Sequence, residues 1–178
     1  MLVIKSDEIP EEGLTLEWVE ERHSLLTYME SLSQIDFDFE KPLHAEATIL
    51  KSGMSIFVKG RVETNLLLHC VRCLKEFSYP LSSTFELTLY PLKESSMIKE
   101  KELEEEDLES DFFKEGEIHL SEIACEQIFL ELPYQPLCKE GCKGLCPRCG
   151  SDLNLSPCSC ESERMGIGFL GLEKLKLK

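Results

Sequence analysis

The sequence has no long apolar run. No stretch of its 178 residues approaches the roughly 20 consecutive apolar residues of a membrane-spanning helix. Residues 1–8 contain no basic segment followed by a long apolar one, which a secretory signal peptide requires. We therefore expect a cytoplasmic protein without a membrane partner.

Residue arrangements that perform catalysis are also missing. The four histidines are scattered, and no Ser, His and Asp arrangement or glycine-rich phosphate-binding loop can be identified. Scattered histidines are more often surface or structural residues than catalytic ones. We expect no enzymatic activity and no small-molecule substrate, and an enzyme that uses thiols or zinc is the competing hypothesis.

Positive charge is scarce. The chain has 19 Lys and Arg against 34 Asp and Glu, which gives a formal net charge of −15. Proteins that bind RNA tightly usually present a basic face, so we do not expect RNA binding by the whole surface. Much of the acid lies between Glu100 and Glu117, which predicts a solvated loop near residues 95–117. An acidic arm that contacts a basic protein or mimics nucleic acid is the alternative.

Alternating apolar and polar residues predict a sheet in the middle of the chain. Leu43–Ile49 and Ile56–Leu68 both alternate with a period of two, and Lys51–Met54 supplies the turn between them. A third strand is expected over Lys75–Tyr90, with one face of the resulting antiparallel meander buried. Two short strands around a turn at Pro10–Gly13 are expected before it.

Two helices complete the expected α+β fold. Val19–Leu32 has no Gly or Pro, and Ser121–Leu132 has Ser121 as its expected N-cap and a proline just after its end. The fold class is thus an antiparallel β-meander with two helices and a C-terminal, zinc-binding, cysteine-rich module. We expect the α+β domain over residues 1–132, the cysteine-rich module over 133–165 and a basic tail over 166–178.

Cysteine, in contrast, is abundant. The chain has nine, and six of them lie between Cys138 and Cys160. In a cytoplasmic protein this clustering favours metal binding over disulfides. Eight of the nine form close pairs in sequence, which are Cys70/Cys73, Cys138/Cys142, Cys146/Cys149 and Cys158/Cys160.

The pair Cys146/Cys149 has the spacing of a zinc knuckle. Pro147 presets its turn, and Gly150 accepts the positive φ that lets backbone N–H groups point at thiolate sulfur. Cys158 and Cys160 are two residues apart, so an extended backbone places both on one face. The segment that joins the two pairs buries little apolar surface, so a metal ion has to supply its folding energy.

The eight paired cysteines suit two structural zinc sites with four thiolates each. Our preferred assignment is a local site of Cys146, Cys149, Cys158 and Cys160, and a second site that joins Cys70 and Cys73 to Cys138 and Cys142. The alternative is one zinc held by four of the six C-terminal cysteines, with Cys70 and Cys73 as core residues. Redox chemistry at Cys70/Cys73 is disfavoured because no helix begins there.

Two segments resemble the YceD family of bacterial large ribosomal RNA subunit accumulation proteins. They are His69-Cys-Val-Arg-Cys-Leu74 and the run from Cys138 to Asn154 with Cys158-Ser-Cys160 after it, and the resemblance extends from Leu43 onward. It implies a non-enzymatic role in 23S rRNA synthesis, processing or accumulation during large-subunit assembly. The implied partner is the pre-50S particle, contacted through 23S rRNA or through a basic ribosomal protein.

A zinc-stabilised protein–protein adaptor without direct RNA contact is the alternative function. The net charge favours this adaptor, whereas the resemblance favours the ribosomal role. If cations contact the particle, we expect them on the most basic local surface, which comprises Arg72, Lys143, Arg148, Lys174, Lys176 and Lys178.

Overall fold

The structure is a computed structural model that describes residues 1–30, 37–92, 110–114 and 116–160. Most of the acidic run predicted near residues 95–117 lies outside the described residues. The basic tail predicted over 166–178, with Lys174, Lys176 and Lys178, also lies outside them.

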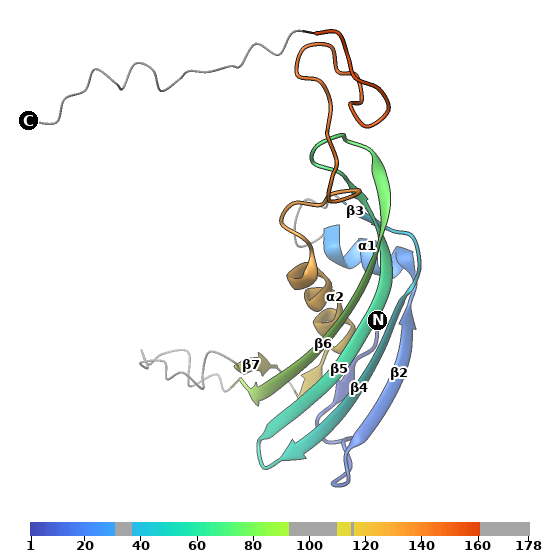
Figure 1. Cartoon of the computed structure of the whole chain (residues 1–178). Coiled ribbons are helices and arrows are strands. Elements are labelled where there is room, and N and C mark those ends of the chain that lie inside the picture. The colour runs from blue at the N-terminus through green and yellow to red at the C-terminus, as the bar shows by residue number, and fades with distance from the viewer. Residues whose placement is uncertain (31–36, 93–109, 115, 161–178) are drawn as a thin grey trace, which may run out of the picture.

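One six-stranded sheet forms the body of the protein (Figure 1). Its strands follow the order β2-β4-β5-β6-β7, and β3 pairs with one end of β5. All pairs are antiparallel except β6 with β7, which run parallel. The strands are β2 (Leu14–Glu20), β3 (Phe37–Phe39), β4 (Leu43–Ser52), β5 (Ser55–His69), β6 (Glu76–Pro91) and β7 (Ser110–Phe113).

The predicted meander is confirmed in β4, β5 and β6. Residues of β4 alternate strictly between buried and exposed from Leu43 to Leu50, and β5 alternates in the same way up to Thr64. A two-residue turn joins these strands, and Gly53 occupies it with φ +63°, a conformation that glycine adopts without strain. The buried set therefore faces one side of the sheet and supplies most of the core.

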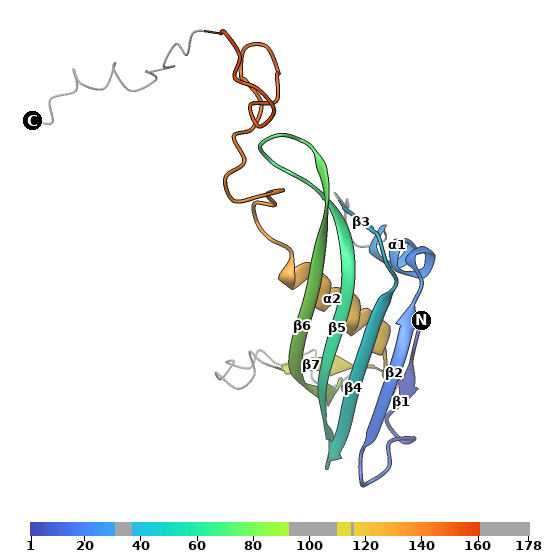
Figure 2. The same cartoon turned by 45° about the vertical axis from the view of Figure 1, so that its right-hand side comes forward.

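Two helices pack against this buried side. α2 (Leu120–Glu131) crosses beneath β5 and β6, and α1 (Arg22–Glu30) lies beside it (Figure 2). Leu120, Ala124 and Ile128 of α2 are almost fully buried against the sheet. Cys125, the one cysteine outside the four pairs, is buried with them as a small core residue, and this burial raises the pKa of its thiol to about 12.

The first predicted helix was placed too early in the chain. Val19 and Glu20 belong to β2, where they pair with His44 and Leu43, and the helix begins only at Arg22. Backbone pairing along a neighbouring strand outweighs helix propensity, which is a weak local preference. The parallel pairing of β7 was also not predicted, because no local pattern specifies it.

Ser121 is not the N-cap of α2, as the sequence had suggested. His119 precedes the helix without a side-chain capping bond, while Ser121 is fully buried inside the first turn. The Ser121 hydroxyl accepts the backbone N–H of Leu2 at 2.6 Å and donates to the buried carboxylate of Glu20. A tertiary network therefore takes the hydroxyl that sequence reasoning assigned to the cap.

The chain start is held in place by a small second sheet. β1 (Ile4–Lys5) pairs antiparallel with β8 (Glu117–Ile118), which leads directly into α2. None of the described helices has the length and apolar character needed to cross a membrane.

Gly60 in the middle of β5 provides a test of the packing. A Cβ at this position would lie 2.8 Å from the carbonyl oxygen of Glu46 and 2.5 Å from the ring of Phe85. We expect Gly60→Ala to lower the free energy of unfolding by about 1–3 kcal/mol, because the backbone oxygen cannot move away. Urea titration measures this, and Thr84→Ala on the exposed face of β6 is the control. A variant as stable as the wild type would contradict this packing.

Candidate metal centres

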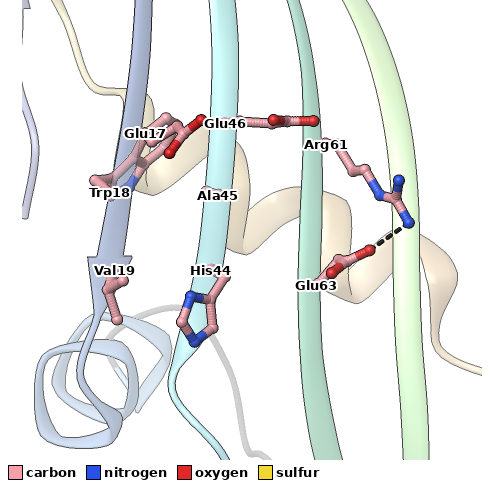
Figure 3. Close-up of a pocket in the computed structure, with 8 residues that line it drawn as sticks. All are labelled: Glu17, Trp18, Val19, His44, Ala45, Glu46, Arg61 and Glu63. Atoms are coloured by element: carbon pink, nitrogen blue, oxygen red, sulfur yellow. Dashed lines mark ion pairs between the residues drawn. The ribbon is translucent and has the colours of Figure 1, made fainter.

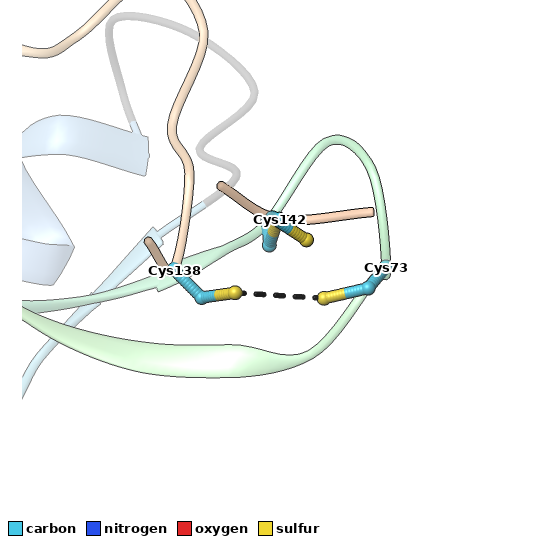
Figure 4. A group of neighbouring side chains, drawn as sticks. Cys73, Cys138 and Cys142 are labelled. Atoms are coloured by element: carbon cyan, nitrogen blue, oxygen red, sulfur yellow. Dashed lines mark hydrogen bonds between the residues drawn. The ribbon is translucent and has the colours of Figure 1, made fainter. Parts of the chain in front are cut away.

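A first group of four cysteines, cluster A, joins the sheet to the segment after α2. Cys70 and Cys73 lie on the turn between β5 and β6, whereas Cys138 and Cys142 follow the helix by several residues. The Sγ atoms of Cys70 and Cys142 are 3.8 Å apart. Those of Cys73 and Cys138 are 3.7 Å apart, and Figure 4 shows this pair beside Cys142. The structure thus brings together two cysteine pairs that are more than 60 residues apart in the sequence.

These distances fit a tetrahedral metal site. All four sulfurs lie within 4.8 Å of one another. A zinc ion with bonds of about 2.3 Å to four sulfurs separates each pair of sulfurs by roughly 3.8 Å, the edge of the tetrahedron. A disulfide would bring two sulfurs to about 2.05 Å. The four thiols are therefore free and spaced so that they can hold one metal ion.

Cluster A is mostly buried, and only Cys138 is partly exposed. Cys70 and Cys142 are 0% and 2% exposed, and Phe77, Leu137 and Leu145 pack around the sulfurs. A buried site with four sulfur donors leaves no position for water or a substrate. Its chemistry is therefore suited to holding structure and not to catalysis.

Backbone N–H groups stabilise thiolate at this cluster. Burial raises the pKa of Cys70, but hydrogen bonds from the backbones of Cys138, Cys73 and Arg72 outweigh it and lower this pKa to about 6. Burial raises the pKa of Cys138 to about 12, and its neighbouring thiols add to this effect. Neighbouring thiols influence each other's pKa, because one thiolate makes it harder for the next thiol to ionise. A bound cation would remove this repulsion and allow all four to be thiolates.

Hydrogen bonds between the turn and the later segment surround cluster A. Val71 donates its N–H to the carbonyl oxygen of Pro136 at 3.0 Å, and Leu145 donates to that of Arg72 at 3.1 Å. The Arg72 guanidinium donates to the carbonyl oxygen of Cys142 at 2.9 Å. Gly144, at φ +74°, lies so close that a Cβ would be 2.9 Å from the Arg72 carbonyl oxygen. These contacts fix the distance between the two cysteine pairs.

A second group, cluster B, consists of Cys146, Cys149, Cys158 and Cys160, whose sulfurs also lie within 4.8 Å of one another. Gly150 has φ +71°, as its place in the knuckle predicts, and donates to the Cys146 carbonyl oxygen at 2.9 Å. The Ser151 hydroxyl, 3.1 Å from the sulfur, and its backbone N–H lower the pKa of Cys149 to about 6. Cluster B is more open than cluster A, because Cys149 is exposed.

Asn154 connects the two clusters, a role that sequence reasoning missed. Its side-chain N–H groups donate to the Cys142 sulfur at 3.4 Å and to the Asp152 carboxylate at 2.7 Å. Its side-chain oxygen accepts the backbone N–H of Lys143 at 2.9 Å. The loop within cluster B thus supplies a hydrogen-bond donor to a cluster A sulfur, and the Asp-x-Asn spacing was the only local signal for such a turn.

The predicted basic surface is only partly described. Lys143 and Arg148 are exposed on the cysteine-rich segment, and Arg72 is engaged with Cys142. The other three cations assigned to this surface lie outside the described residues.

A shallow pocket of about 510 Å³ lies on the face of the sheet opposite the helices (Figure 3). Its ionisable residues are three glutamates, His44 and Arg61, and Arg61 forms an ion pair with Glu63, two residues further along β5. Its single arginine is paired and its other charged groups are carboxylates, so the pocket is not suited to binding phosphate.

Comparisons with known proteins relate this arrangement to a family. Residues 58–176 match the family described as "Large ribosomal RNA subunit accumulation protein YceD". An Arabidopsis thaliana protein, "Large ribosomal RNA subunit accumulation protein YCED homolog 1, chloroplastic", is 26% identical in an alignment of 162 residues that covers 79% of this chain and 50% of that protein.

Bacterial relatives are similar too. An uncharacterized protein of Mycobacterium leprae (strain TN) is 24% identical over 71% of this chain and 56% of its own length. One of Mycobacterium tuberculosis (strain H37Rv) is 31% identical over 57% of this chain and 47% of its own. The chain thus spans about half the length of the curated relatives it matches, and no solved structure matches it. Since the family match covers most of the chain and includes all eight paired cysteines, the chain belongs to the YceD family.

Proposed function

We propose that the chain is a non-enzymatic factor that supports 23S rRNA synthesis, processing or accumulation during assembly of the large ribosomal subunit. The observation that carries this proposal is the family match over residues 58–176, whose description refers to accumulation of an RNA and not to a reaction. A mostly buried cluster of four cysteines, whose sulfurs would occupy every position around one ion, is consistent with a structural role. We place its action in the cytoplasm, on the pre-50S particle.

We further propose that both clusters hold structural zinc. Cys70, Cys73, Cys138 and Cys142 would hold one ion, and Cys146, Cys149, Cys158 and Cys160 the other. Sulfur donors at tetrahedral spacing fit zinc, and a bound ion would contribute folding energy to a segment with little apolar core. Arg72 and Asn154 would help to orient one of the ligands, since both donate hydrogen bonds to Cys142.

The acidic character of the chain favours a protein over RNA as the direct contact. The net charge of −15 opposes approach to a phosphate backbone, and each four-thiolate zinc site adds two negative charges. We propose that the chain contacts the particle mainly through a basic ribosomal protein, with Lys143 and Arg148 as candidate contacts to RNA. The adaptor without RNA contact remains the second candidate, and this charge is the observation in its favour.

Zinc content tests the metal proposal. Purified protein is expected to carry about two zinc ions per chain, one for each cluster, by native mass spectrometry. Replacing Cys70 and Cys73 with Ser should remove one ion, and so should replacing Cys146 and Cys149. Cys125→Ala, which alters the cysteine outside both clusters, should keep both ions. Protein without zinc that is nevertheless folded would rule the proposal out.

The link through Asn154 can be tested separately. Asn154→Leu removes the donor to the Cys142 sulfur and the acceptor for Lys143 with little change in volume. We expect about 10–100-fold weaker metal binding at cluster A in a chelator titration, because partners of this kind orient the ligands. Alkylation and peptide mapping should show that the four cluster A cysteines become reactive before those of cluster B, because they lose their metal first. Leu155→Ala, at an exposed neighbouring position, is the control, and equal retention in both variants would refute the link.

The ribosomal role predicts an RNA phenotype. Depletion of the protein should lower 23S rRNA relative to 16S rRNA, because only large-subunit assembly would fail. Northern blots and sucrose gradients measure both RNAs and the particles that contain them. Wild-type protein should restore the ratio, whereas a variant with Ser at Cys70 and Cys73 should not. An unchanged ratio after depletion would leave only the adaptor function.

A further inference from the structure

An apolar groove of about 850 Å³ lies beside cluster A. Its walls come from β3, the last residues of β5, the turn that carries Cys70, and the segment that follows α2. Most of the side chains that line it are apolar, and they include Phe37, Leu67, Val71, Leu74, Leu132 and Tyr134. The groove therefore lies where the segment after α2 meets the sheet, next to cluster A.

Three large apolar side chains of this groove are unusually exposed. Val71 is 52% exposed, Leu74 is 66% exposed and Tyr134 is 96% exposed. Leu74 is also the one described non-glycine residue with a positive φ, +59°, a conformation that costs a leucine energy. Hydrogen bonds from Leu74 to Cys70 and from Cys70 to Lys75 hold it there. The turn around Cys70 and Cys73 sets this φ, since Gly150 has the same conformation directly after Cys149. The turn does not require an exposed leucine at this position, so the exposed side chain favours a binding role.

The charged side chains that line the groove are acidic. Its lining contains two carboxylates, Asp38 and Glu76, and neither Lys nor Arg. Asp38 is paired with Arg22, which leaves Glu76 and the adjoining thiolates as the remaining negative charges. Cys70 belongs both to the groove wall and to cluster A, so a four-thiolate zinc site would place two further negative charges next to it.

We propose that this groove binds an extended or helical segment of a basic protein, with apolar side chains between Tyr134, Leu74 and Val71 and flanking Lys or Arg residues near Glu76 and cluster A. The proposal rests on the proposed function, since it names the class of partner through which the chain would reach the pre-50S particle. Apolar anchors with a charged rim are how such grooves bind peptide segments. RNA is disfavoured because the groove offers no cation to a phosphate.

Synthetic peptides test the proposal directly on the full-length, zinc-loaded chain. One peptide has a central Leu-Phe pair flanked by lysines, a second has serines at the centre, and a third has glutamates in place of the lysines. Fluorescence anisotropy should show binding of the first peptide only. Leu74→Gly and Tyr134→Ser should each weaken it about tenfold, as loss of a central anchor does. Leu74→Gly also removes the strain at φ +59°, so loss of binding is not loss of folding.

Matched variants separate the groove from general attraction to an acidic protein. Leu155→Gly removes a leucine that is 78% exposed outside the groove, and Glu17→Lys reverses an exposed charge on β2. Neither should change binding, whereas Glu76→Lys should weaken it. Equal binding of both lysine-rich peptides, or equal effects of groove and control variants, would overturn the proposal. Binding of a 23S rRNA fragment that is lost in Leu74→Gly would also overturn the proposal, because RNA would then occupy the groove. Self-association in sedimentation that is lost in Leu74→Gly would overturn it too, because a second copy of the chain would then occupy the groove.

The two proposals fail separately. If depletion lowers 23S rRNA but no basic peptide binds the groove, the ribosomal role stands and the groove inference falls. If the peptide binds but depletion leaves 23S rRNA unchanged, the groove inference stands as part of an adaptor and the ribosomal role falls.

Discussion

The cysteine-rich segment after α2 depends on one constraint, which is that four sulfurs from two distant parts of the chain meet at cluster A. Cys70 and Cys73 are presented by a turn of the sheet, whereas Cys138 and Cys142 come from a segment with few apolar residues of its own. Hydrogen bonds from Val71 and Arg72 align the two pairs but are too few to hold this segment by themselves. Metal binding at cluster A would convert a weak docking into a fixed one.

The other features follow in order from this junction. The sheet and α2 supply a platform with a conventional apolar core that contains none of the eight paired cysteines. Cluster B then shapes the loop that carries Asn154, and Asn154 reaches back to the sulfur of Cys142. The two clusters are therefore linked by one hydrogen-bonded residue, and the apolar groove exists only where the sheet and the later segment meet.

The sequence predicted the parts of this arrangement that have a local signature. Period-two alternation was sufficient for β4, β5 and β6, and Gly150 has the positive φ that its knuckle spacing requires. Ser121 was misassigned because its hydroxyl bonds to Glu20 and Leu2, which are more than 100 residues away in the sequence. The groove and the role of Asn154 were inaccessible for the same reason, since both arise from segments that meet only in the folded chain.

If metal holds the segment after α2 to the Cys70 turn, then hydrogen exchange at the amides that join them should depend on metal. Full-length protein should be compared with and without a zinc chelator, by mass spectrometry of the exchanged peptides. We predict that chelation accelerates exchange in the peptides that contain Val71 and Leu145 together, because these two amides donate across cluster A, while the middle of β4 remains protected. Acceleration of one segment without the other, or of neither, would contradict the account.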